Sequence, residues 1–448
     1  MARTTSPFRC AECGWQTTKW VGRCGECQAW GTVEEVGAVK PRTVAVAPIG
    51  TPAVPIGAID VDTARARSTG IGELDRVLGG GIVPGAVVLL AGEPGIGKST
   101  LLVEVAAKAA ATHGRALYVT AEESAAQVHL RARRVGAIVD ELLLVAETDL
   151  GTILGHIEQT QPGVLILDSV QTVASGELDA QPGSVTQIRE VAASIIRVAK
   201  ARGMATVLVG HVTKDGSIAG PRVLEHLVDV VLQLEGDRHT RLRLLRAAKN
   251  RYGAADEVGC FDLTDTGIIG IDDPSGLFVS GRGEPVDGTC LTMTMEGTRP
   301  LLAEVQALVA STQVPTPRRA TSGLDNARVA MVLAVLERRG GVPLAARDVH
   351  AATVGGVRIT EPAADLAIAL AIAGAAANRA LPAGHIAIGE VGLSGDVRRV
   401  PNLARRLSEA ARLGITHAIV PPDAGTPPRG MTCIEVPDIR AALRMLIA

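Results

Sequence analysis

The 448-residue chain has no large excess of charge of either sign, since 45 lysines and arginines stand against 47 acidic residues. A net charge of −2 excludes a globally basic nucleic-acid binder, so any contact with DNA must come from a local patch or channel. The longest uncharged apolar run, residues 366–377, is too short to cross a bilayer, and the N-terminal MARTTSPFRC lacks the apolar core of a signal peptide. We therefore expect a cytoplasmic protein without membrane contacts, in which cysteines stay reduced.

Lysine is scarce: the chain has seven, and none follows Lys249. The C-terminal part therefore cannot supply the lysine of a Ser–Lys catalytic dyad, in which lysine activates the serine. A chain of this length is expected to form two or three domains, and its 47% hydrophobic and 21% charged residues are typical of globular proteins.

The stretch GEPGIGKS at residues 92–99 fits the phosphate-binding P-loop pattern G-x-x-x-x-G-K-[ST]. An apolar run at residues 86–90 predicts a buried parallel strand before it, and helical periodicity predicts a helix over 99–113 that Gly114 ends. Backbone N–H groups and the helix dipole then face phosphate, Lys98 reaches the β- and γ-phosphates, and Ser99 ligates Mg²⁺. The predicted nucleotide-binding residues are Gly92, Glu93, Pro94, Gly95, Ile96, Gly97, Lys98, Ser99 and Thr100.

Three further apolar runs each lead to a polar side chain that suits a nucleotide site. Residues 116–120 lead to Glu122, which is placed to polarise the water attacking the γ-phosphate, although a solvated helix-capping acid fits the same pattern. Residues 164–167 lead to Asp168, the acid expected of a Walker B element, which would hold Mg²⁺ through its water shell. Residues 205–209 lead to His211, which either senses the γ-phosphate for the loop at 212–222 or caps the strand.

A basic turn follows the strand-like stretch at residues 241–247. It consists of Lys249, Asn250, Arg251, Tyr252 and Gly253. Its two cations either stabilise phosphate charge, contact a nucleic-acid backbone, or form an ordinary solvated face.

Four of the seven cysteines form two C-x-x-C pairs with ten residues between them: Cys10 with Cys13 and Cys24 with Cys27. Two such knuckles close a tetrahedral four-sulfur site for Zn²⁺, and metal ligation would supply on the order of 10 kcal/mol of folding free energy to so small a module. A redox pair or an iron–sulfur cluster is the alternative. All three tryptophans of the chain lie within or beside this module, and residues 36–62, rich in Pro and Gly, are predicted to be a linker.

Together these motifs closely resemble the bacterial RadA/Sms DNA repair proteins over nearly the whole chain. The resemblance rests on the four-cysteine knuckle, LGGG…GEPGIGKST, LYVTAEES, VLILDSVQT, the K-N-R-[FY]-G turn and MEGTRPLL at residues 295–302. It implies a RecA-like, ATP-dependent DNA motor in a hexameric ring, which extends heteroduplex by branch migration on single-stranded or branched DNA together with RecA.

The resemblance also implies residue roles. Lys98 and Ser99 would be the Walker A pair, Asp168 the Walker B acid, Glu122 the catalytic glutamate and His211 the γ-phosphate sensor. The signature motif at residues 249–253 would act near the subunit interface, and it has tyrosine at position 252 where the family usually has phenylalanine.

The chain from about residue 287 resembles the proteolytic domain of Lon. The position of the Lon serine reads Ala363 and that of the lysine reads Ala404, so the resemblance implies a retained fold without peptidase chemistry. Arg398, Arg399, Arg405 and Arg406 suggest a basic edge that touches DNA phosphates or a neighbouring subunit, unless they are ordinary solvated arginines.

We therefore predict an α/β protein: a zinc knuckle (1–35), a linker (36–62), a RecA-like P-loop ATPase core (63–275) and an α+β Lon-protease-like domain (287–448). In the motor hypothesis, the loop after His211 faces a central channel with Lys214 and Arg222, and Lys249 and Arg251 are further DNA-binding candidates. The alternative hypothesis is an ATP-switched scaffold that loads RecA or a helicase.

Overall fold

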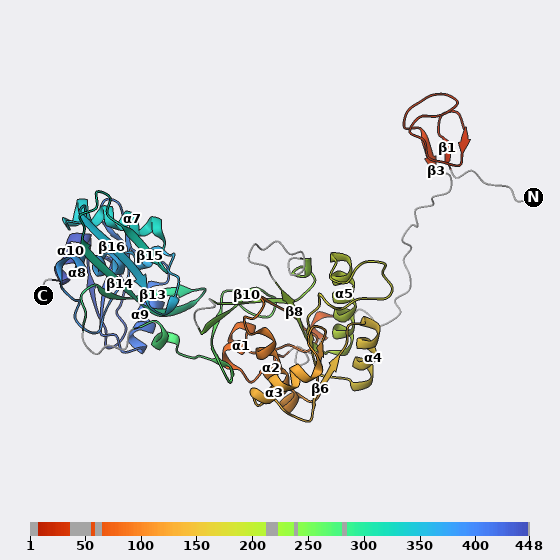
Figure 1. The fold of residues 1–448 in the computed structure, drawn as a ribbon, viewed down its shortest axis with the longest axis horizontal. Helices are drawn as coiled ribbons and strands as arrows, with labels where there is room; N and C mark the ends of the chain where they lie inside the picture. Colours follow the sequence, from red (N-terminus) through yellow and green to blue (C-terminus); the bar gives the residue numbers. More distant parts are fainter. Residues whose placement is uncertain are drawn as a thin grey trace, which may run out of the picture. The chain divides into compact units, whose positions relative to one another are not determined.

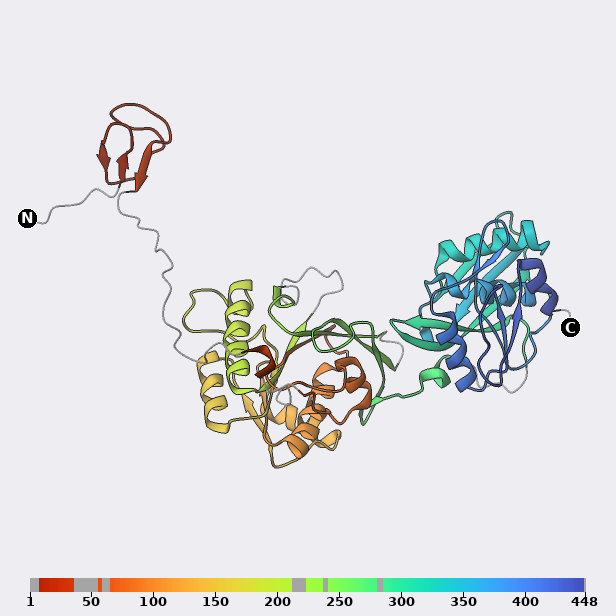
Figure 2. The same cartoon turned by 180° about the vertical axis from the view of Figure 1, so that it is seen from behind.

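The computed structural model describes residues 8–35, 55–58, 65–211, 223–236, 241–279 and 285–446. The chain divides into two compact units, residues 1–60 and 61–448, which are described separately (Figures 1 and 2). No helix in the described part of the chain is long and apolar enough to cross a membrane.

The N-terminal unit is a small antiparallel sheet in the order β2-β1-β3. Its strands are β1 (Phe8–Cys10), β2 (Gln16–Thr17) and β3 (Val33–Glu35), and one turn of 3-10 helix, η1 (Ile56–Ala58), follows. Cys10, Cys24 and Val33 form its buried centre, against which Phe8 and Trp15 pack. This is far too little apolar surface to hold a fold by itself, which agrees with the expectation that metal ligation completes it.

The second unit begins with a nine-stranded sheet in the order β12-β11-β10-β9-β4-β8-β7-β5-β6. The strands are β4 (Val87–Gly92), β5 (Ala116–Thr120), β6 (Leu142–Ala146), β7 (Val164–Asp168), β8 (Ala205–His211), β9 (Val230–Glu235), β10 (Leu242–Asn250), β11 (Val258–Thr264) and β12 (Gly267–Gly270). The six strands from β9 to β6 pair in parallel, and β10 to β12 extend the sheet with antiparallel pairs.

Helices cover both faces of the parallel strands, as their continuous apolar sequences require. The apolar cores show α1 (Gly72–Leu78), α2 (Lys98–His113) and α3 (Ala125–Arg134) on one face, with α4 (Leu150–Thr160) and α5 (Val185–Arg202) on the other. The strand predicted at 116–120 has those bounds, and those predicted at 164–167 and 205–209 are present but extend to Asp168 and His211. Since parallel strands end at the same edge of a sheet, the polar residues that follow them come together there.

The chain then forms a mixed seven-stranded sheet in the order β15-β16-β14-β13-β17-β20-β21 and a separate two-stranded sheet, β18-β19. The strands are β13 (Thr289–Glu296), β14 (Arg299–Ser311), β15 (Arg319–Ser322), β16 (Arg347–Thr353), β17 (His385–Ala387), β18 (Glu390–Val391), β19 (Val397–Arg398), β20 (His417–Val420) and β21 (Thr432–Glu435). The helices are α7 (Asn326–Val335), α8 (Asp365–Ala377), α9 (Leu403–Arg412) and α10 (Ile439–Leu443), with short turns η3 (Pro274–Leu277), η4 (Leu336–Gly340), η5 (Val354–Gly356), η6 (Pro362–Ala364) and η7 (Arg444–Leu446).

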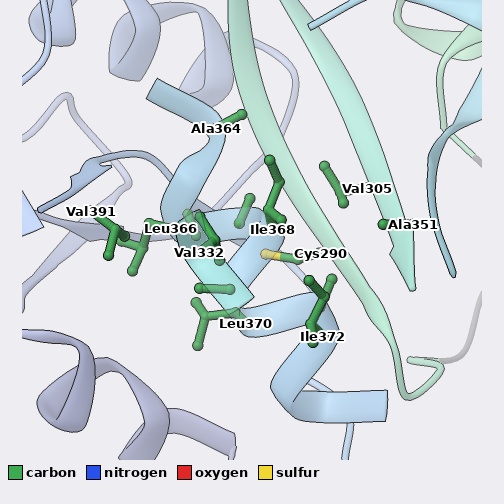
Figure 3. Packing of buried hydrophobic residues seen from close by; sticks show 14 of the residues in the cluster. Cys290, Val305, Val332, Ala351, Ala364, Leu366, Ile368, Leu370, Ile372 and Val391 are labelled. Carbon is green, nitrogen blue, oxygen red and sulfur yellow. The ribbon is translucent and has the colours of Figure 1, made fainter. Parts of the chain in front are cut away.

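The long apolar run of the sequence is α8, which is buried on all sides from Asp365 to Ala375. Figure 3 shows its Leu366, Ile368, Leu370 and Ile372 beside Cys290 of β13 and other core residues. A helix that is hydrophobic all round belongs inside a protein core, and this one forms the centre of the C-terminal part.

The β13–β14 hairpin joins the two parts of the second unit. Near its turn, Arg299 donates to the carboxylate of Glu73 in α1, and Glu296 pairs with Arg246 of β10. Glu73 is 1% exposed, so this ion pair lies inside the protein. The contact extends across the predicted boundary between the ATPase core and the Lon-like domain.

The predicted basic edge of the Lon-like domain is wrong for Arg406. This side chain is 1% exposed and pairs with Glu361, because α9 places Leu403, Arg406, Leu407 and Ala410 on its buried face. Arg398, by contrast, is exposed and paired with Asp396.

Candidate nucleotide-hydrolysis site

The loop between β4 and α2 has the geometry that phosphate binding needs. Gly95 and Gly97 adopt φ values of +80° and +113°, which only glycine reaches without strain, and α2 begins directly after them at Lys98. No side chain caps the start of α2. The backbone N–H groups there are therefore available to an anion, with the helix dipole favouring negative charge.

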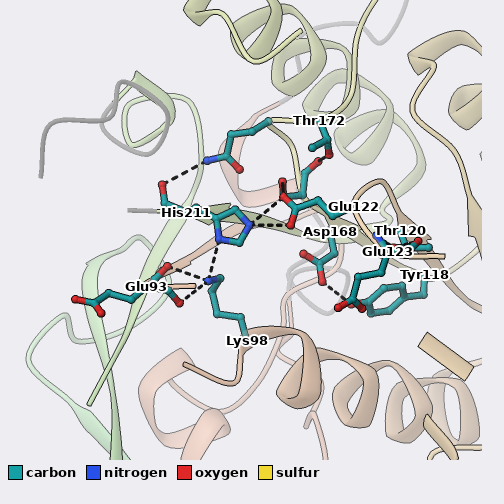
Figure 4. A network of polar contacts seen from close by, with 12 residues as sticks. Glu93, Lys98, Tyr118, Thr120, Glu122, Glu123, Asp168, Thr172 and His211 are labelled. Carbon is teal, nitrogen blue, oxygen red and sulfur yellow. Dashed lines mark hydrogen bonds and ion pairs between the residues drawn. The ribbon is translucent and has the colours of Figure 1, made fainter. Parts of the chain in front are cut away.

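Lys98 is folded back into the site and is only 4% exposed. Its Nζ donates to the carbonyls of Gly92 at 2.8 Å and Glu93 at 3.0 Å, and it lies 3.2 Å from His211 Nδ1 (Figure 4). Burial lowers the pKa of the Lys98 ammonium, and the negative charges of Asp168 and Glu122 partly oppose that shift. The lysine is thus held in place by neutral acceptors that phosphate oxygens could replace.

His211 connects Lys98 to Glu122. Its Nε2 lies 3.0 Å from Glu122 Oε1, so a ring that accepts from the Lys98 ammonium at Nδ1 donates to the carboxylate from Nε2. Ser169 also donates its hydroxyl to Glu122 Oε1. The hydrogen bond with His211, together with that from Ser169, outweighs partial burial and lowers the pKa of Glu122. Glu122 is consequently an ionised, oriented carboxylate, as a residue that positions water must be.

Asp168 ends β7 beside these residues and is 7% exposed. The Tyr118 hydroxyl donates to its Oδ2 at 2.7 Å, and burial and this neighbouring charge raise the pKa of Tyr118. Among the described residues, no hydrogen bond to the other oxygen, Oδ1, is found. Mg²⁺ prefers hard oxygen ligands. The carboxylate of Asp168 and the hydroxyl of Ser99, in the first turn of α2, are such ligands, so these residues fit this ion.

Two residues of this site, Tyr118 and Ser169, were not predicted from the sequence. A phenol in an otherwise aliphatic buried strand needs a hydrogen-bond partner, so this rule could have identified Tyr118 as a residue of the site. Ser169 directly follows the Walker B acid and is fully buried, which the sequence alone does not reveal.

The signature motif lies away from this cluster. Lys249 and Asn250 belong to the end of β10 rather than to a turn, and they pair with β9 after a register shift between Ala247 and Lys249. Lys249 Nζ donates to the carbonyls of Glu225 and Val228 at 2.7 and 2.8 Å.

The other members of the motif also have partners outside the hydrolysis site. Arg251 pairs with Asp229 at 3.1 Å, and Asn250 donates to the carbonyls at the end of α1. Exposed Tyr252 and Gly253 follow. Lys214 and Arg222, the predicted channel residues, lie outside the described residues.

The four cysteines of the N-terminal unit converge. All four Sγ atoms lie within 4.8 Å of one another, with Cys13 and Cys24 3.5 Å apart and Cys10 and Cys27 3.7 Å apart. Tetrahedral Zn–S bonds of about 2.3 Å place sulfurs about 3.8 Å apart, so these residues fit Zn²⁺. In the described part of the chain, this is the single cluster of three or more His, Cys, Asp or Glu side chains that could hold a metal ion.

These features define a class of protein: a P-loop ATPase with a RecA-like α/β core, an N-terminal four-cysteine zinc ribbon and a C-terminal Lon-like domain. Family models agree, since residues 8–35 match a rubredoxin metal binding domain, 53–217 an AAA domain, and 355–424 the subunit ChlI of Mg-chelatase. A solved KaiC-like protein, PH0186 from Pyrococcus horikoshii, is 22% identical with a TM-score of 0.39, covering 46% of this chain and 99% of that one. That distant likeness supports no further conclusion.

Curated relatives match over the full length. The DNA repair protein RadA of Mycobacterium tuberculosis is 55% identical over 455 residues, covering 100% of this chain and 94% of the relative. The DNA repair protein RadA of Streptococcus pyogenes is 44% identical over 427 residues, covering 95% and 94%. The chain belongs to the RadA family of DNA repair proteins.

Proposed function

We propose that the protein is a DNA-dependent ATPase that acts as a motor in homologous recombination and DNA repair. It drives branch migration on single-stranded or branched DNA, in the cytoplasm and in cooperation with RecA. The observation that carries the proposal is the hydrogen-bonded chain from Lys98 through His211 to Glu122, beside Asp168. This arrangement provides both a phosphate-binding cation and a water-positioning carboxylate, as ATP hydrolysis requires. The family supports the assignment to DNA repair.

In the proposed cycle, ATP phosphates take over Lys98 from the carbonyls of Gly92 and Glu93. His211 Nδ1 then loses its partner and turns toward the γ-phosphate, while Glu122 orients the attacking water. Ser99 and Asp168 would hold Mg²⁺, which neutralises charge on the β- and γ-phosphates when bound. His211 is the last residue of β8, and we propose that its ring passes the state of the γ-phosphate to the following loop, in which Lys214 and Arg222 contact DNA.

Lys249 and Arg251 are proposed to act on a neighbouring subunit of a hexameric ring. Two observations support this role. Arg251 is exposed and Lys249 is half-buried, and the partners of both residues lie outside the hydrolysis site. Cations held this way can reach the phosphates of ATP in an adjacent subunit or a DNA backbone.

The test is Glu122→Gln, with Glu123→Gln as the matched control. Glu123 is the next residue, but its carboxylate pairs with Arg131 at 2.5 Å and serves that ion pair instead. We expect Glu122→Gln to bind ATP, to hydrolyse it about 10²- to 10⁴-fold more slowly and to lose branch migration, while Glu123→Gln keeps both activities.

Two other functions predict different results. A scaffold that only needs bound ATP would keep full repair activity with Glu122→Gln, and ATP hydrolysis that ignores single-stranded DNA would contradict the motor. A Ser–Lys protease is not proposed, because no lysine follows Lys249 and the position that corresponds to the Lon serine reads Ala363.

A further inference from the structure

The N-terminal unit presents two large aromatic side chains to solvent. Trp20 is 66% exposed and Trp30 is 75% exposed. Both rings lie beside Gly22, because a methyl group on this glycine would come within 3.8 Å of the Trp20 ring and 3.9 Å of the Trp30 ring. The absence of a side chain at position 22 therefore leaves the space between the indoles open.

The backbone holds these two tryptophans side by side. Residues Arg23 and Trp30 form an isolated antiparallel bridge, and Gly31 N donates to Gly22 O at 2.9 Å. Arg23 Nε donates to the Gln28 carbonyl at 2.9 Å, which places the guanidinium carbon 5.6 Å from the centroid of the Trp30 ring. We call Lys19, Trp20, Gly22, Arg23 and Trp30 the indole surface.

The charge of the indole surface has one sign. Residues 14–23 and 28–32, which supply it, contain Lys19 and Arg23 but no carboxylate; the unit's acids are at positions 12, 26, 34 and 35. Lys19 and Arg23 are exposed, and within the described residues 8–34 neither makes an ion pair with an acid. The surface thus combines two flat rings with two exposed cations that make no ion pair with an acid among the described residues of this unit.

The fold itself does not use these two indoles. Trp15, the third tryptophan, packs into the small core and lies so close to Gly25 that a side chain there would collide with its ring. Trp20 and Trp30 are outside that core, although the whole chain contains only three tryptophans, two tyrosines and three phenylalanines. A chain so poor in aromatic residues exposes two of its largest ones on one small surface, which indicates binding.

We propose that the indole surface binds single-stranded DNA, with bases stacked on Trp20 and Trp30 and phosphates paired with Lys19 and Arg23. Stacking on aromatic side chains combined with a cationic track is how proteins bind single strands without reading sequence. Tryptophan and arginine are also common in protein–protein hot spots, so a protein partner is the alternative that the experiment below distinguishes. The proposal rests on the proposed DNA function and assigns one contact to the zinc ribbon.

All three tryptophans lie in this unit, so intrinsic tryptophan fluorescence of the full-length protein reports on the ribbon alone. We expect oligo(dT) of about 30 nucleotides, long enough for several stacking sites, to quench this emission to saturation. The Trp20→Ala/Trp30→Ala variant should retain Trp15 emission and bound zinc but bind fluorescein-labelled oligo(dT) more weakly in a fluorescence-anisotropy titration. Its ATPase rate without DNA should be unchanged.

The contribution of Lys19 and Arg23 is tested by measuring how the affinity for oligo(dT) depends on salt concentration. In Lys19→Ala/Arg23→Ala, the half-saturation of quenching should move to higher oligonucleotide concentration. The slope of log affinity against log salt should fall by about 1.4, since each phosphate contact on a single strand contributes about 0.7. An unchanged slope would show that Lys19 and Arg23 do not contact phosphates, which would contradict that part of the proposal.

Several outcomes overturn the proposal without touching the proposed function. One is DNA that stimulates the ATPase but leaves tryptophan emission unchanged. Another is that the indoles are already shielded from acrylamide in the DNA-free protein, because the chain itself would then cover them. Quenching by purified RecA but not by oligo(dT) would reassign the surface to a protein. Quenching by oligo(dT) with an ATPase indifferent to DNA would instead support this contact and refute the motor.

Discussion

Replacing Arg406 by methionine should destabilise the C-terminal part of the chain by up to about 3–5 kcal/mol, because it leaves the carboxylate of Glu361, whose side chain is 25% exposed, without its partner. Arg406 donates to both oxygens of Glu361, at 2.8 and 2.5 Å, and to the Met293 carbonyl at 2.5 Å. Without the guanidinium, Glu361 keeps only the hydrogen bonds from Thr294 Oγ1 at 2.8 Å and Met295 N at 2.7 Å. Both go to Oε1, so the variant loses the donor to Oε2 as well as the counter-charge.

The size of the effect follows from the electrostatics. Two unit charges about 4 Å apart attract by about 4 kcal/mol at an effective dielectric constant of about 20, which agrees with measured losses when one partner of a buried pair is removed. Adding Glu361→Gln should restore most of the stability, because the amide oxygen still accepts from Thr294 and Met295 and no charge remains buried. Arg398→Met is the control, since its pair with Asp396 is 56% and 38% exposed and screened by solvent, so that removing it should change stability far less.

The loss of stability in Arg406→Met should also depend on pH. Burial opposes ionisation of Glu361, but the hydrogen bonds and charge of Arg406 outweigh it and lower the pKa from 4.5. In the parent protein this pair therefore stabilises the fold above pH 4.5, and the contribution disappears as pH falls through the lowered folded-state value. In Arg406→Met burial still raises the pKa of Glu361 but is opposed only by the hydrogen bonds from Met295 and Thr294, so this pKa should lie above that in the parent protein. The gap in stability between the two proteins should therefore be widest at neutral pH and should narrow below pH 4.5.

Native-state hydrogen exchange measures this locally, without requiring the whole chain to unfold in one step. The amides of α8 and α9 should exchange faster in Arg406→Met at neutral pH, with a smaller difference at about pH 4. A loss no larger than that of Arg398→Met, or a gap of the same size at both pH values, would refute the reasoning.

Three further predictions concern the remaining sites. Tyr118→Phe removes a donor to Asp168, and the Mg²⁺ concentration for half-maximal ATPase activity should rise by about 10-fold; an unchanged requirement would contradict this positioning role. His211→Ala removes the hydrogen bond that lowers the pKa of Glu122 most, so the acidic limb of kcat/KM for ATP should move to higher pH, and a limb that stays in place would disprove the connection. Stripping metal with a chelator should release one zinc per chain and shift tryptophan emission toward that of exposed indole, while the circular dichroism of the second unit remains, because the two units are separately compact.

The sequence predicted the nucleotide-binding edge of the sheet well because its signals are local. A glycine loop between an apolar strand and a helix, and acids directly after apolar runs, each depend on a few neighbouring residues. The parallel sheet then brings the ends of β4, β5, β7 and β8 to one edge whatever the details of packing. Lys98, Glu122, Asp168 and His211 meet there for that reason.

Contacts between distant segments were beyond the sequence. Glu73 and Arg299 are 226 residues apart and nothing in either neighbourhood identifies the other. Arg406 had a usable signal that was missed: Leu403, Leu407 and Ala410 recur at helical spacing around it, which places the arginine on the apolar face. A cation at such a position needs a buried acid, and Glu361 supplies it.

The pairing of Glu73 with Arg299 has a consequence for deletion mapping. A shortened chain that stops before β13 removes Arg299 along with the Lon-like domain, and leaves the 1%-exposed carboxylate of Glu73 in α1 with the 45%-exposed Arg76, 3.3 Å away, as its remaining counter-charge. Such a deletion weakens the ATPase core directly, so lost activity would be misread as a requirement for the missing domain. Combining the deletion with Glu73→Gln separates the two effects, because the neutral amide still accepts from Cys260 N, as the carboxylate does at 2.7 Å.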